Sequence, residues 1–417
     1  MHGIKRAVRT ARVGLFLLAG AKGIEKKGGD GMQTLYFDHS ASTPPHEQVI
    51  RTMAEVMAAH YANPGSLHRA GGEALKLMER ARASVAEWLG AKPQEVVFTS
   101  GGTESNNLAI KGIVGGVGRK RKHIVTSAVE HASVYQCVRQ LEEAGVAVTV
   151  VPVDRDGLVS PEQVRAAVRD DTVLVSIMHV NNETGAIQPI REIGKALSDC
   201  PHVRFHVDGV QAIAKVPVAW KDWGVDLYTG SAHKFRGPKG VGFLLVREGV
   251  RLAPLNAGGG QEHGMRSGTS NVPGIVAAAQ ALRIAMEGAE ERLVRWRTLR
   301  RRILEGVREI PELVYNGSER EELQAPHIIN LSYPGMRPEV LVHTLEQNGI
   351  LVSTQSACSS RSLQPSRVLK AMGFDDARAA GSIRISMGDE HDEAAVELLL
   401  ERLKKAVAEL KPLAKTR

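Results

Sequence analysis

The sequence has few cysteines, few aromatic residues and no long apolar run. Its 417 residues include three cysteines, Cys137, Cys200 and Cys358, which are too few and too scattered for a disulfide framework or a zinc site built from cysteine pairs. No apolar run approaches the roughly 18 residues that a membrane-spanning helix needs. Aromatic residues make up only 4% of the chain, which argues against the base-stacking platforms of nucleic-acid-binding proteins. We therefore expect a soluble protein of the reducing cytoplasm, without a membrane or direct nucleic-acid partner.

Positive charge is concentrated at the beginning of the chain. The formal net charge is +8, and residues 1–31 hold seven Lys or Arg against two acidic residues, which accounts for +5 of it. The remainder is ordinary for a protein of this size. The basic leader resembles a targeting peptide, but its apolar stretch, 13–20, is short and no convincing cleavage site follows. We expect the leader to be untranslated or unstructured, with Met32 as the true start. A mitochondrial transit peptide is the alternative.

Short β-branched runs alternate with helical stretches between about 95 and 250. The runs are 96–99, 123–129, 146–153, 172–178, 203–209 and 240–246. Such alternation predicts a mostly parallel sheet with helices on both faces. Ligands of open α/β sheets bind at the carboxyl ends of the strands, and most of the unusual polar residues follow these runs directly. We therefore expect the functional site at that edge of the sheet.

The chain after the glycine-rich segment 253–271 has a different pattern. A helical pattern rich in Arg and Leu runs over about 273–309, and a charged amphipathic pattern covers 392–411. Strand-like runs lie between them, at 327–333, 350–357 and 382–387. We predict a large domain over 47–269 and a smaller α+β domain formed by 32–46 together with 270–417.

The segment 100–110 follows a predicted strand and begins a helix. Its glycines and Thr103 can present backbone N–H groups and a hydroxyl to a phosphate at the helix N-terminus. An ordinary helix start explains this segment equally well when it is taken alone.

Lys234 follows Ser231 and His233 at the end of another predicted strand. An amine there can form an imine with an aldehyde cofactor, while the neighbouring hydroxyl and imidazole groups bind the cofactor phosphate. Asp208 also ends a strand, and a carboxylate beside a pyridine nitrogen keeps that nitrogen protonated. Taken singly, Asp208 and Lys234 are as well explained as surface groups. Together with segment 100–110 they indicate a cofactor site.

Three further polar residues lie at strand ends or within a strand. His131 has an imidazole that can stack on a cofactor ring and move protons. Asn181 closes another strand and can approach the ring or the substrate. Arg384 lies in a predicted strand of the smaller domain, and its guanidinium suits bidentate binding of an α-carboxylate. Each of them alone is equally consistent with a structural role.

Cys358 lies in the run Ser-Ala-Cys-Ser-Ser, after a predicted strand and before a loop rich in Ser, Arg and Gln. A reactive thiol needs access and a setting that favours the thiolate, and Arg361 and Arg367 add positive charge nearby. Cys137 and Cys200 lack such a context, so we expect them to be buried or inert.

These segments form an ordered series of motifs that runs from about Tyr36 to the C-terminus. The motifs are YFDHSASTP (36–44), FTSGGTESNNLAI (98–110), TSAVEH (126–131), NNETGAIQPI (181–190), HVDGVQA (206–212), SAHK (231–234), GPKGVG (237–242), GGGQEHGMRSGTSN (258–271), SACSS (356–360) and SIRIS (382–386). In them the chain resembles the cysteine desulfurases, the NifS/IscS-like branch of the class V aminotransferase group.

The resemblance implies a homodimeric fold-type I transferase that uses pyridoxal 5′-phosphate (PLP), with a mostly parallel seven-stranded sheet in its large domain and no metal. By this match Lys234 binds PLP covalently, Asp208 lies at the pyridine nitrogen, Gln211 lies near the ring hydroxyl, and His131 stacks on the ring. The phosphate ligands that it implies are Gly102, Thr103, Ser231 and His233, with Thr269 reaching in from the other subunit. Asn181 and Arg384 match positions that handle the substrate, and Asn181 also lies near the cofactor.

The activity implied by the resemblance is conversion of L-cysteine to L-alanine, with the sulfur held as a persulfide on Cys358. The sequence after Cys358 matches the long-loop branch, which passes sulfur directly to an acceptor protein such as an iron–sulfur scaffold or a tRNA- or thiamine-thiolating enzyme. Gln355 stands where the family commonly has glycine, which favours a thiolating acceptor. His39 begins the run His-Ser-Ala-Ser-Thr in place of the usual Asn-Ala-Ala-Thr-Thr, and Gly209 replaces a frequent alanine.

Two other functions are weighed against this one. A selenocysteine lyase, or another class V lyase, needs no protein thiol, and the presence of Cys358 in its loop argues against it. A catalytically idle binding module predicts loss of Lys234, Asp208 or Cys358, and all three are present.

Overall fold

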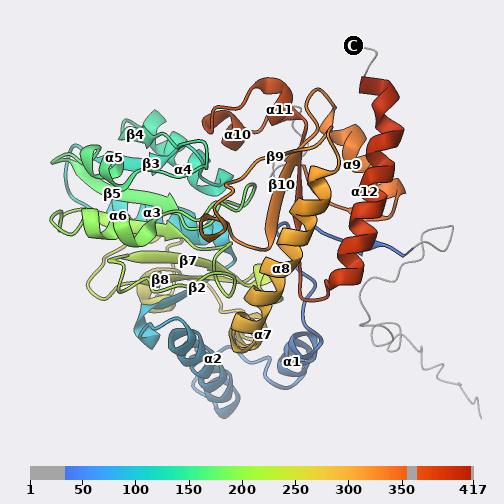
Figure 1. Ribbon diagram of the computed structural model, residues 1–417. Coiled ribbons are helices and arrows are strands. Elements are labelled where there is room, and N and C mark those ends of the chain that lie inside the picture. Colours follow the sequence, from blue (N-terminus) through green and yellow to red (C-terminus); the bar gives the residue numbers. More distant parts are fainter. Residues whose placement is uncertain (1–32, 355–363, 415–417) are drawn as a thin grey trace, which may run out of the picture.

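The fold is that of a computed structural model, in which residues 33–354 and 364–414 are described. A large sheet with helices on both faces makes up one side of the molecule, and a smaller region of helices and short strands makes up the other (Figure 1). The predicted leader, Gln355, Cys358 and Arg361 lie outside the described residues. Within the described ranges, no helix has both the length and the apolar character needed to cross a bilayer.

A seven-stranded sheet forms the centre of the larger region. Its strand order is β2-β8-β7-β6-β5-β3-β4, and β8 alone runs opposite to the other six strands. The strands are β2 (Val96–Thr99), β3 (His123–Ser127), β4 (Ala147–Val151), β5 (Thr172–Met178), β6 (Arg204–Asp208), β7 (Leu227–Ser231) and β8 (Gly242–Val246). The mostly parallel, seven-stranded sheet expected for the α/β fold is confirmed. Strand β7 was not among the predicted β-branched runs.

Helices cover both faces of this sheet because successive strand residues point to opposite sides. In β2, Val97 packs in a cluster with Leu108 of α3 (Gly102–Gly116) and Val134 of α4 (Ala132–Glu143). Its neighbour Phe98 belongs to the cluster on the opposite face. The helices that contribute to that second cluster are α1 (Glu47–Ala59), α2 (Arg69–Trp88), α5 (Pro161–Ala166), α6 (Ile190–Ala196) and α7 (Val272–Glu287).

The smaller region has its own apolar core. An antiparallel sheet in the order β12-β10-β9 packs against long helices through residues such as Ile329, Ile385, Trp296 and Leu403. Phe37 belongs to the same core, because β1 near the start of the chain pairs with β11. The elements are β1 (Leu35–Tyr36), β9 (Val314–Tyr315), β10 (Ile328–Ser332), β11 (Ile350–Leu351), β12 (Ser382–Ser386), α8 (Ala289–Arg308), α9 (Pro338–Gln347), α10 (Arg367–Ala371), α11 (Asp376–Ala380) and α12 (Glu393–Ala414). The exact domain boundaries stay a prediction.

Two of the predicted elements are shorter than expected. The helical pattern over 273–309 is two helices, α7 and α8, which meet at Gly288. Glycine weakens a helix, and each half packs in a different core, so one continuous helix does not form. In the described part of the predicted strand 350–357, which extends to Thr354, regular pairing ends at Leu351, and Ser353 makes only an isolated bridge to Arg384.

Candidate active site

A cavity opens at the carboxyl ends of strands β5, β6 and β7, facing the smaller region. It has about 160 Å³ of water-accessible volume. Nine of the predicted site residues line it, namely Gly102, Thr103, His131, Asp208, Gln211, Ser231, His233, Lys234 and Arg384. Residues that are far apart in the sequence thus meet in one place, because parallel strands bring their carboxyl ends to the same edge of the sheet.

The N-terminus of α3 forms a cradle on one wall of this cavity. Gly101, which precedes the helix, has a φ of 151°, and no side chain caps the first turn. A β-carbon on Gly102 would come within 2.7 Å of the Val210 side chain, so only glycine fits there. Burial and the charges of nearby lysines lower the pKa of His233 to about 3, so its imidazole is neutral. Uncapped N–H groups beside Ser231 and His233 suit a phosphate.

A hydrogen-bonded chain joins Asp208 to His131 across the cavity. Asn106 of α3 donates to Asp208 Oδ2 at 2.7 Å and to Ser133 Oγ at 2.8 Å. Ser133 in turn lies 2.8 Å from His131 Nδ1, and its backbone N–H also donates to that nitrogen. Nδ1 therefore acts as an acceptor, which places the imidazole proton on Nε2. Burial lowers the pKa of His131, so the ring is neutral.

Lys234 ends a short 3₁₀ turn, Ala232–Lys234, directly after β7. Its ammonium donates to the carbonyl oxygens of Ser40 and, at 2.8 Å, of Ala41. Gln211 donates to the same Ser40 carbonyl at 2.9 Å, and its side-chain oxygen accepts a hydrogen bond from Lys215 at 3.2 Å. The loop that carries Ser40 and Ala41 therefore positions the amine that the sequence predicts to be reactive.

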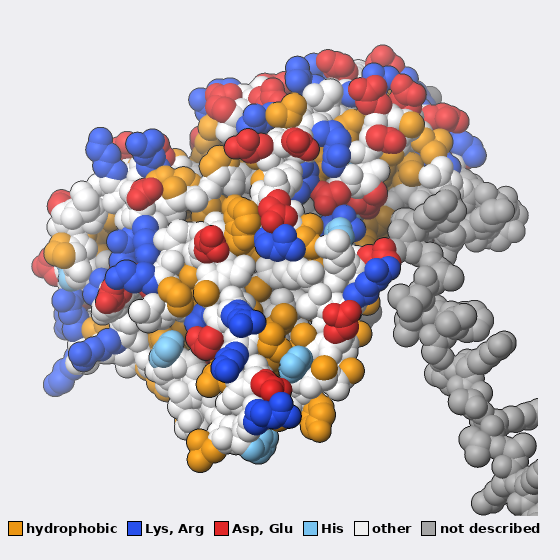
Figure 2. Space-filling view, turned by 90° about the horizontal axis from the view of Figure 1, so that it is seen from below, with side chains coloured by type: hydrophobic (Ala, Val, Ile, Leu, Met, Phe, Trp, Pro, Cys, Tyr) orange, Lys and Arg blue, Asp and Glu red, His pale blue; other side chains and the backbone are white. Residues whose placement is uncertain are grey.

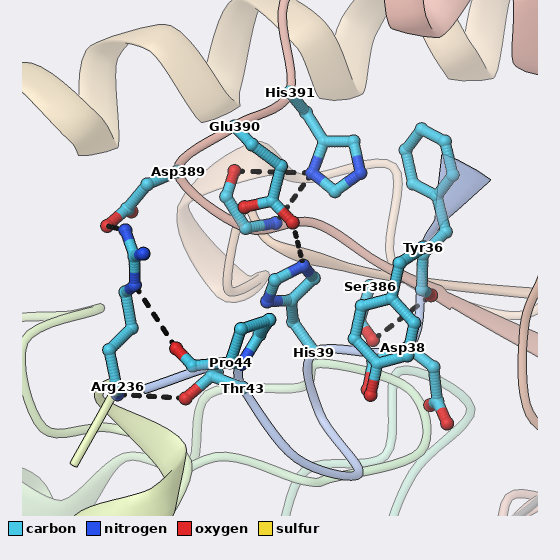
Figure 3. Close-up of polar contacts among 12 residues, drawn as sticks. Tyr36, Asp38, His39, Thr43, Pro44, Arg236, Ser386, Asp389, Glu390 and His391 are labelled. Carbon is cyan, nitrogen blue, oxygen red and sulfur yellow. Dashed lines mark hydrogen bonds and ion pairs between the residues drawn. The ribbon is translucent and has the colours of Figure 1, made fainter. Parts of the chain in front are cut away.

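This loop, residues 38–43, is held in place by the smaller region (Figure 3). His39 lies 2.6 Å from Glu390, and the Ser40 N–H donates to Ser386 Oγ at 2.8 Å. Burial opposes ionisation of Glu390, but the hydrogen bond and charge of His39 outweigh it and lower the Glu390 pKa to about 2. His39 thus replaces the usual asparagine with a side chain that anchors the loop.

His39, Glu390 and His391 are also the one group of potential metal ligands among residues 33–354 and 364–414. His391 already hydrogen-bonds the backbone at Gly388 and Tyr36, and its ring stacks on Phe37. The His391 ring is therefore used in holding the chain, and we assign the group a structural role.

Arg384 extends from β12 into the cavity and is only 1% exposed. It donates to Asp38 Oδ1 at 2.9 Å and to the Asn182 carbonyl oxygen at 3.0 Å. Among the described residues its Nε has no hydrogen-bond partner. A buried guanidinium that lines the cavity and keeps one N–H without a partner among the described residues is suited to binding a carboxylate.

Asn181 and Thr269 are not among the residues that line the cavity. The Asn181 side chain donates to the Val129 carbonyl oxygen at 3.0 Å and accepts from the Glu183 and Thr184 N–H groups at 2.9 Å, so it shapes the turn after β5. Its neighbour Asn182 lines the cavity instead. Thr269 is exposed and lines a separate hollow with residues of β2 and α7.

The remaining candidates concern the cysteines. Cys137 and Cys200 are buried as expected, and burial raises the pKa of Cys137 to about 11. Arg367, predicted to add charge near Cys358, donates to the carbonyl oxygens of Ala128 and Glu130. Its guanidinium also lies 4.4 Å from the centre of the Tyr135 ring. Arg367 therefore fixes the turn that leads to His131.

Gly209 departs from the alanine that is frequent after the cofactor aspartate, and the structure explains why. A β-carbon on Gly209 would lie 2.1 Å from the ring of Tyr228. Tyr228 is fully buried, and its hydroxyl lies 2.8 Å from His179 Nδ1. The Tyr228 ring therefore leaves room only for glycine at position 209.

Glu130, next to His131, is a buried acid that sequence reasoning did not single out. Its Oε1 accepts hydrogen bonds from Ser127 and from the Met178 N–H, while Oε2 has no partner among the described residues. Burial, aided by the charge of Asp208, raises the Glu130 pKa to about 8. In the folded protein the Glu130 carboxyl is therefore mostly protonated at neutral pH.

This pKa predicts how pH affects stability. Because the folded pKa lies above the usual value, the contribution of Glu130 to stability is complete at low pH and is lost as pH rises towards 8. Glu130→Gln keeps a neutral side chain at every pH. We expect the variant to gain stability relative to the wild type between about pH 5 and pH 8, by on the order of a few kcal/mol. Urea unfolding of both proteins at the two pH values measures this difference in stability. A difference that is the same at both pH values would contradict a buried, neutral acid.

Comparison with known proteins agrees with this geometry. The family model Aminotransferase class-V matches residues 35–399. A protein named cysteine desulfurase IscS from Methanosarcina thermophila is 42% identical over 379 residues, covering 91% of this chain and 93% of the relative. One of the same name from Clostridium botulinum is 41% identical, covering 89% and 94%.

Solved structures give the same result. A NifS-like protein superposes with a TM-score of 0.85 at 38% identity, covering 91% of this chain and all of the other. A NifS-like protein from Rickettsia africae superposes with a TM-score of 0.81 at 29% identity, covering 90% and 100%. Cavity, fold and relatives thus agree, and the chain belongs to the class-V aminotransferase family, in its NifS/IscS-like branch.

Proposed function

We propose that this protein is a PLP-dependent cysteine desulfurase, which converts L-cysteine to L-alanine and takes the sulfur onto Cys358. The observation that carries the proposal is the meeting of Lys234, Asp208, the α3 cradle and Arg384 in one cavity. These groups match, one for one, an aldehyde, a pyridine nitrogen, a phosphate and a substrate carboxylate. Relatives named cysteine desulfurase, alike over nine-tenths of the chain, support the choice of substrate.

The residues around the cavity fit PLP. Lys234 would hold its aldehyde carbon, Asp208 its ring nitrogen and Gln211 its ring hydroxyl, with His131 against the ring. The phosphate would be held by Gly102, Thr103, Ser231 and His233. When bound, PLP would draw electrons from the α-carbon of an amino acid and so weaken its C–H bond.

The protein's own groups then have defined tasks. Arg384 binds the α-carboxylate through its guanidinium, with the adjacent Asn182 completing this wall. Asn181 supports that wall from the turn behind it. The Lys234 amine, which lines the cavity, would accept the α-proton and return it.

Sulfur transfer is the task of Cys358. Its thiolate attacks the substrate sulfur, the carbon–sulfur bond breaks, and the carbon keeps the electron pair and gains a proton. L-cysteine plus the enzyme thiol therefore gives L-alanine plus an enzyme persulfide, with no outside oxidant. An external thiol then releases the outer sulfur by exchange.

We also propose a homodimer in which Thr269 of one chain completes the phosphate site of the other. Large apolar side chains are exposed around α1, α2 and their connection, on the face shown in Figure 2. They are Ile50, Met57, Tyr61, Leu67 and Leu75, each between 41% and 105% exposed. Such a patch is typical of an interface between chains. A solution mass equal to one chain would contradict the dimer.

We further propose which proteins accept the sulfur and in which compartment the protein acts. Gln355 favours a thiolating enzyme for tRNA or thiamine as the sulfur acceptor, with an iron–sulfur scaffold as the second candidate. Three scattered cysteines suit the cytoplasm. Incubation of cell extract with the protein carrying radioactive sulfur on Cys358 tests both acceptors. Label that appears on neither class would contradict them.

The proposed reaction has a simple test. Purified protein given PLP, L-cysteine and dithiothreitol should form sulfide and L-alanine in equal amounts, because one carbon–sulfur bond breaks per turnover. Sulfide is measured colorimetrically, and L-alanine by chromatography. Pyruvate and ammonia in place of alanine would contradict the proposal and indicate a lyase of another type.

A further inference from the structure

Arg384, which lines the cavity, already binds one carboxylate of the protein itself, that of Asp38. Arg384 Nη2 donates to Asp38 Oδ1 at 2.9 Å, and Ser353 Oγ donates to Asp38 Oδ2 at 2.7 Å. Both oxygens of the carboxylate are therefore held. The backbone at Asp38 bridges to Ser386, and the Tyr36 hydroxyl donates to the Asp38 carbonyl oxygen at 3.2 Å. Asp38 is thus fixed in place by its side chain and its backbone.

This arrangement decides how much charge Arg384 offers to a ligand. A guanidinium that is 1% exposed would be costly without a counter-charge, and Asp38 supplies one before any ligand enters. An incoming carboxylate then meets a guanidinium whose positive charge is already balanced by Asp38. Two carboxylates that share one guanidinium repel each other, and low exposure of the site strengthens that repulsion.

We propose that Asp38 sets the affinity of the site for amino-acid carboxylates, holding it low enough for the product to leave. The inference rests on the proposed function, because it takes the ligand at Arg384 to be the carboxylate of substrate or product. Asp38 is a positioning and affinity-setting residue and does not touch the reacting atoms. Its effect comes from its charge, whereas Ser353 acts only by orienting it.

The test compares three variants of the PLP-loaded protein in a titration with L-alanine, followed by the cofactor absorbance. Asp38→Asn keeps the shape and the acceptor oxygen but removes the charge, and we expect it to bind L-alanine about tenfold more tightly. The KM for L-cysteine should fall similarly, while kcat stays equal or falls. Ser353→Ala keeps the charge, and we expect its affinity to stay within about twofold of the wild type.

Asp389→Asn is the matched control. This carboxylate lies near the same loop but pairs with Arg236 at 3.2 Å and Arg292 at 3.6 Å rather than with Arg384. We expect it to leave the affinity for L-alanine unchanged. Should Asp38→Asn fail to fold, Asp38→Ser removes the same charge with a smaller side chain, and the same increase in affinity is expected.

The possible results distinguish a wrong role for Asp38 from a wrong function for the protein. A wild-type protein that binds PLP and L-alanine, with an Asp38→Asn variant that binds L-alanine no more tightly, overturns the role of Asp38 alone. Equal tightening in Ser353→Ala overturns it too, because geometry rather than charge would then be responsible. A wild-type protein that binds no PLP overturns the proposed function and this inference with it.

Discussion

Lys234→Ala is expected to lose the yellow absorbance of a lysine–cofactor Schiff base and at least about a thousandfold in the rate of alanine formation. The amine donates hydrogen bonds to carbonyl oxygens of the loop 38–43 and lines the cavity together with Asp208 and Arg384. Its removal takes away both the covalent link to PLP and the group that we assign to carry the α-proton. PLP should still bind noncovalently, since the phosphate cradle and Asp208 remain.

Lys239→Ala is the control for this variant. Lys239 follows Lys234 by five positions and is exposed, so its loss removes the same charge from the same segment without altering the cavity. Its absorbance and activity should equal those of the wild type. Retention of the Schiff-base absorbance in Lys234→Ala would show that another lysine binds the cofactor, with the buried Lys215 as the first to examine.

Cys358→Ala is expected to keep the cofactor absorbance and to lose sulfide release completely. PLP and substrate would still bind, because Lys234, Asp208, Arg384 and the α3 cradle are unchanged. Without a thiolate to take the substrate sulfur, the carbon–sulfur bond is not broken in the direction of alanine. Sulfide assays on variant and wild type, at equal cofactor content, measure the difference.

The buried cysteine Cys200 offers a comparison for this loss. Cys200 is 4% exposed, and its thiol donates to Asp199 at 3.3 Å, so Cys200→Ala should keep full activity. If sulfide release survives in Cys358→Ala and not in Cys200→Ala, the wrong cysteine has been assigned. Survival in both would favour a selenocysteine lyase or a related lyase that needs no protein thiol.

Much of the site follows from the sequence because its residues lie at strand ends. Asp208 ends β6, Lys234 follows β7 and the glycines at the start of α3 follow β2, and parallel strands bring such positions together. Patterns of β-branched residues predicted most of these strands. Strand β7, with Thr, Gly and Ser in its sequence, lacks that pattern and was predicted only as an apolar stretch that ends before Lys234.

Other parts of the site depend on contacts between distant segments, which no local pattern reveals. The loop 38–43 carries no strand-end signal, yet its carbonyl groups hold Lys234, and Asp38 pairs with Arg384. Asn106 lies inside a segment that the sequence did single out. Its role in linking Asp208 to Ser133 emerges only when α3 packs over the sheet.

Helix boundaries show the same dependence on packing. The pattern over 273–309 is helical throughout, and the division at Gly288 arises because α7 packs in the core of the large sheet while α8 packs in the smaller one. Asn181 is a comparable case. Its polar character predicts contact with a ligand, which stays a prediction, and its hydrogen bonds also close the turn that presents Asn182.

The most direct test of the central claim is the mass of the peptide that contains Cys358. Protein loaded with PLP is mixed with L-cysteine in the absence of any reducing thiol, then alkylated and digested. We predict that this peptide is heavier by one sulfur atom in the wild type, that the peptides of Cys137 and Cys200 are unchanged, and that L-alanine appears in an amount equal to the added sulfur. An unmodified Cys358 peptide alongside formation of L-alanine would contradict transfer of sulfur to this cysteine.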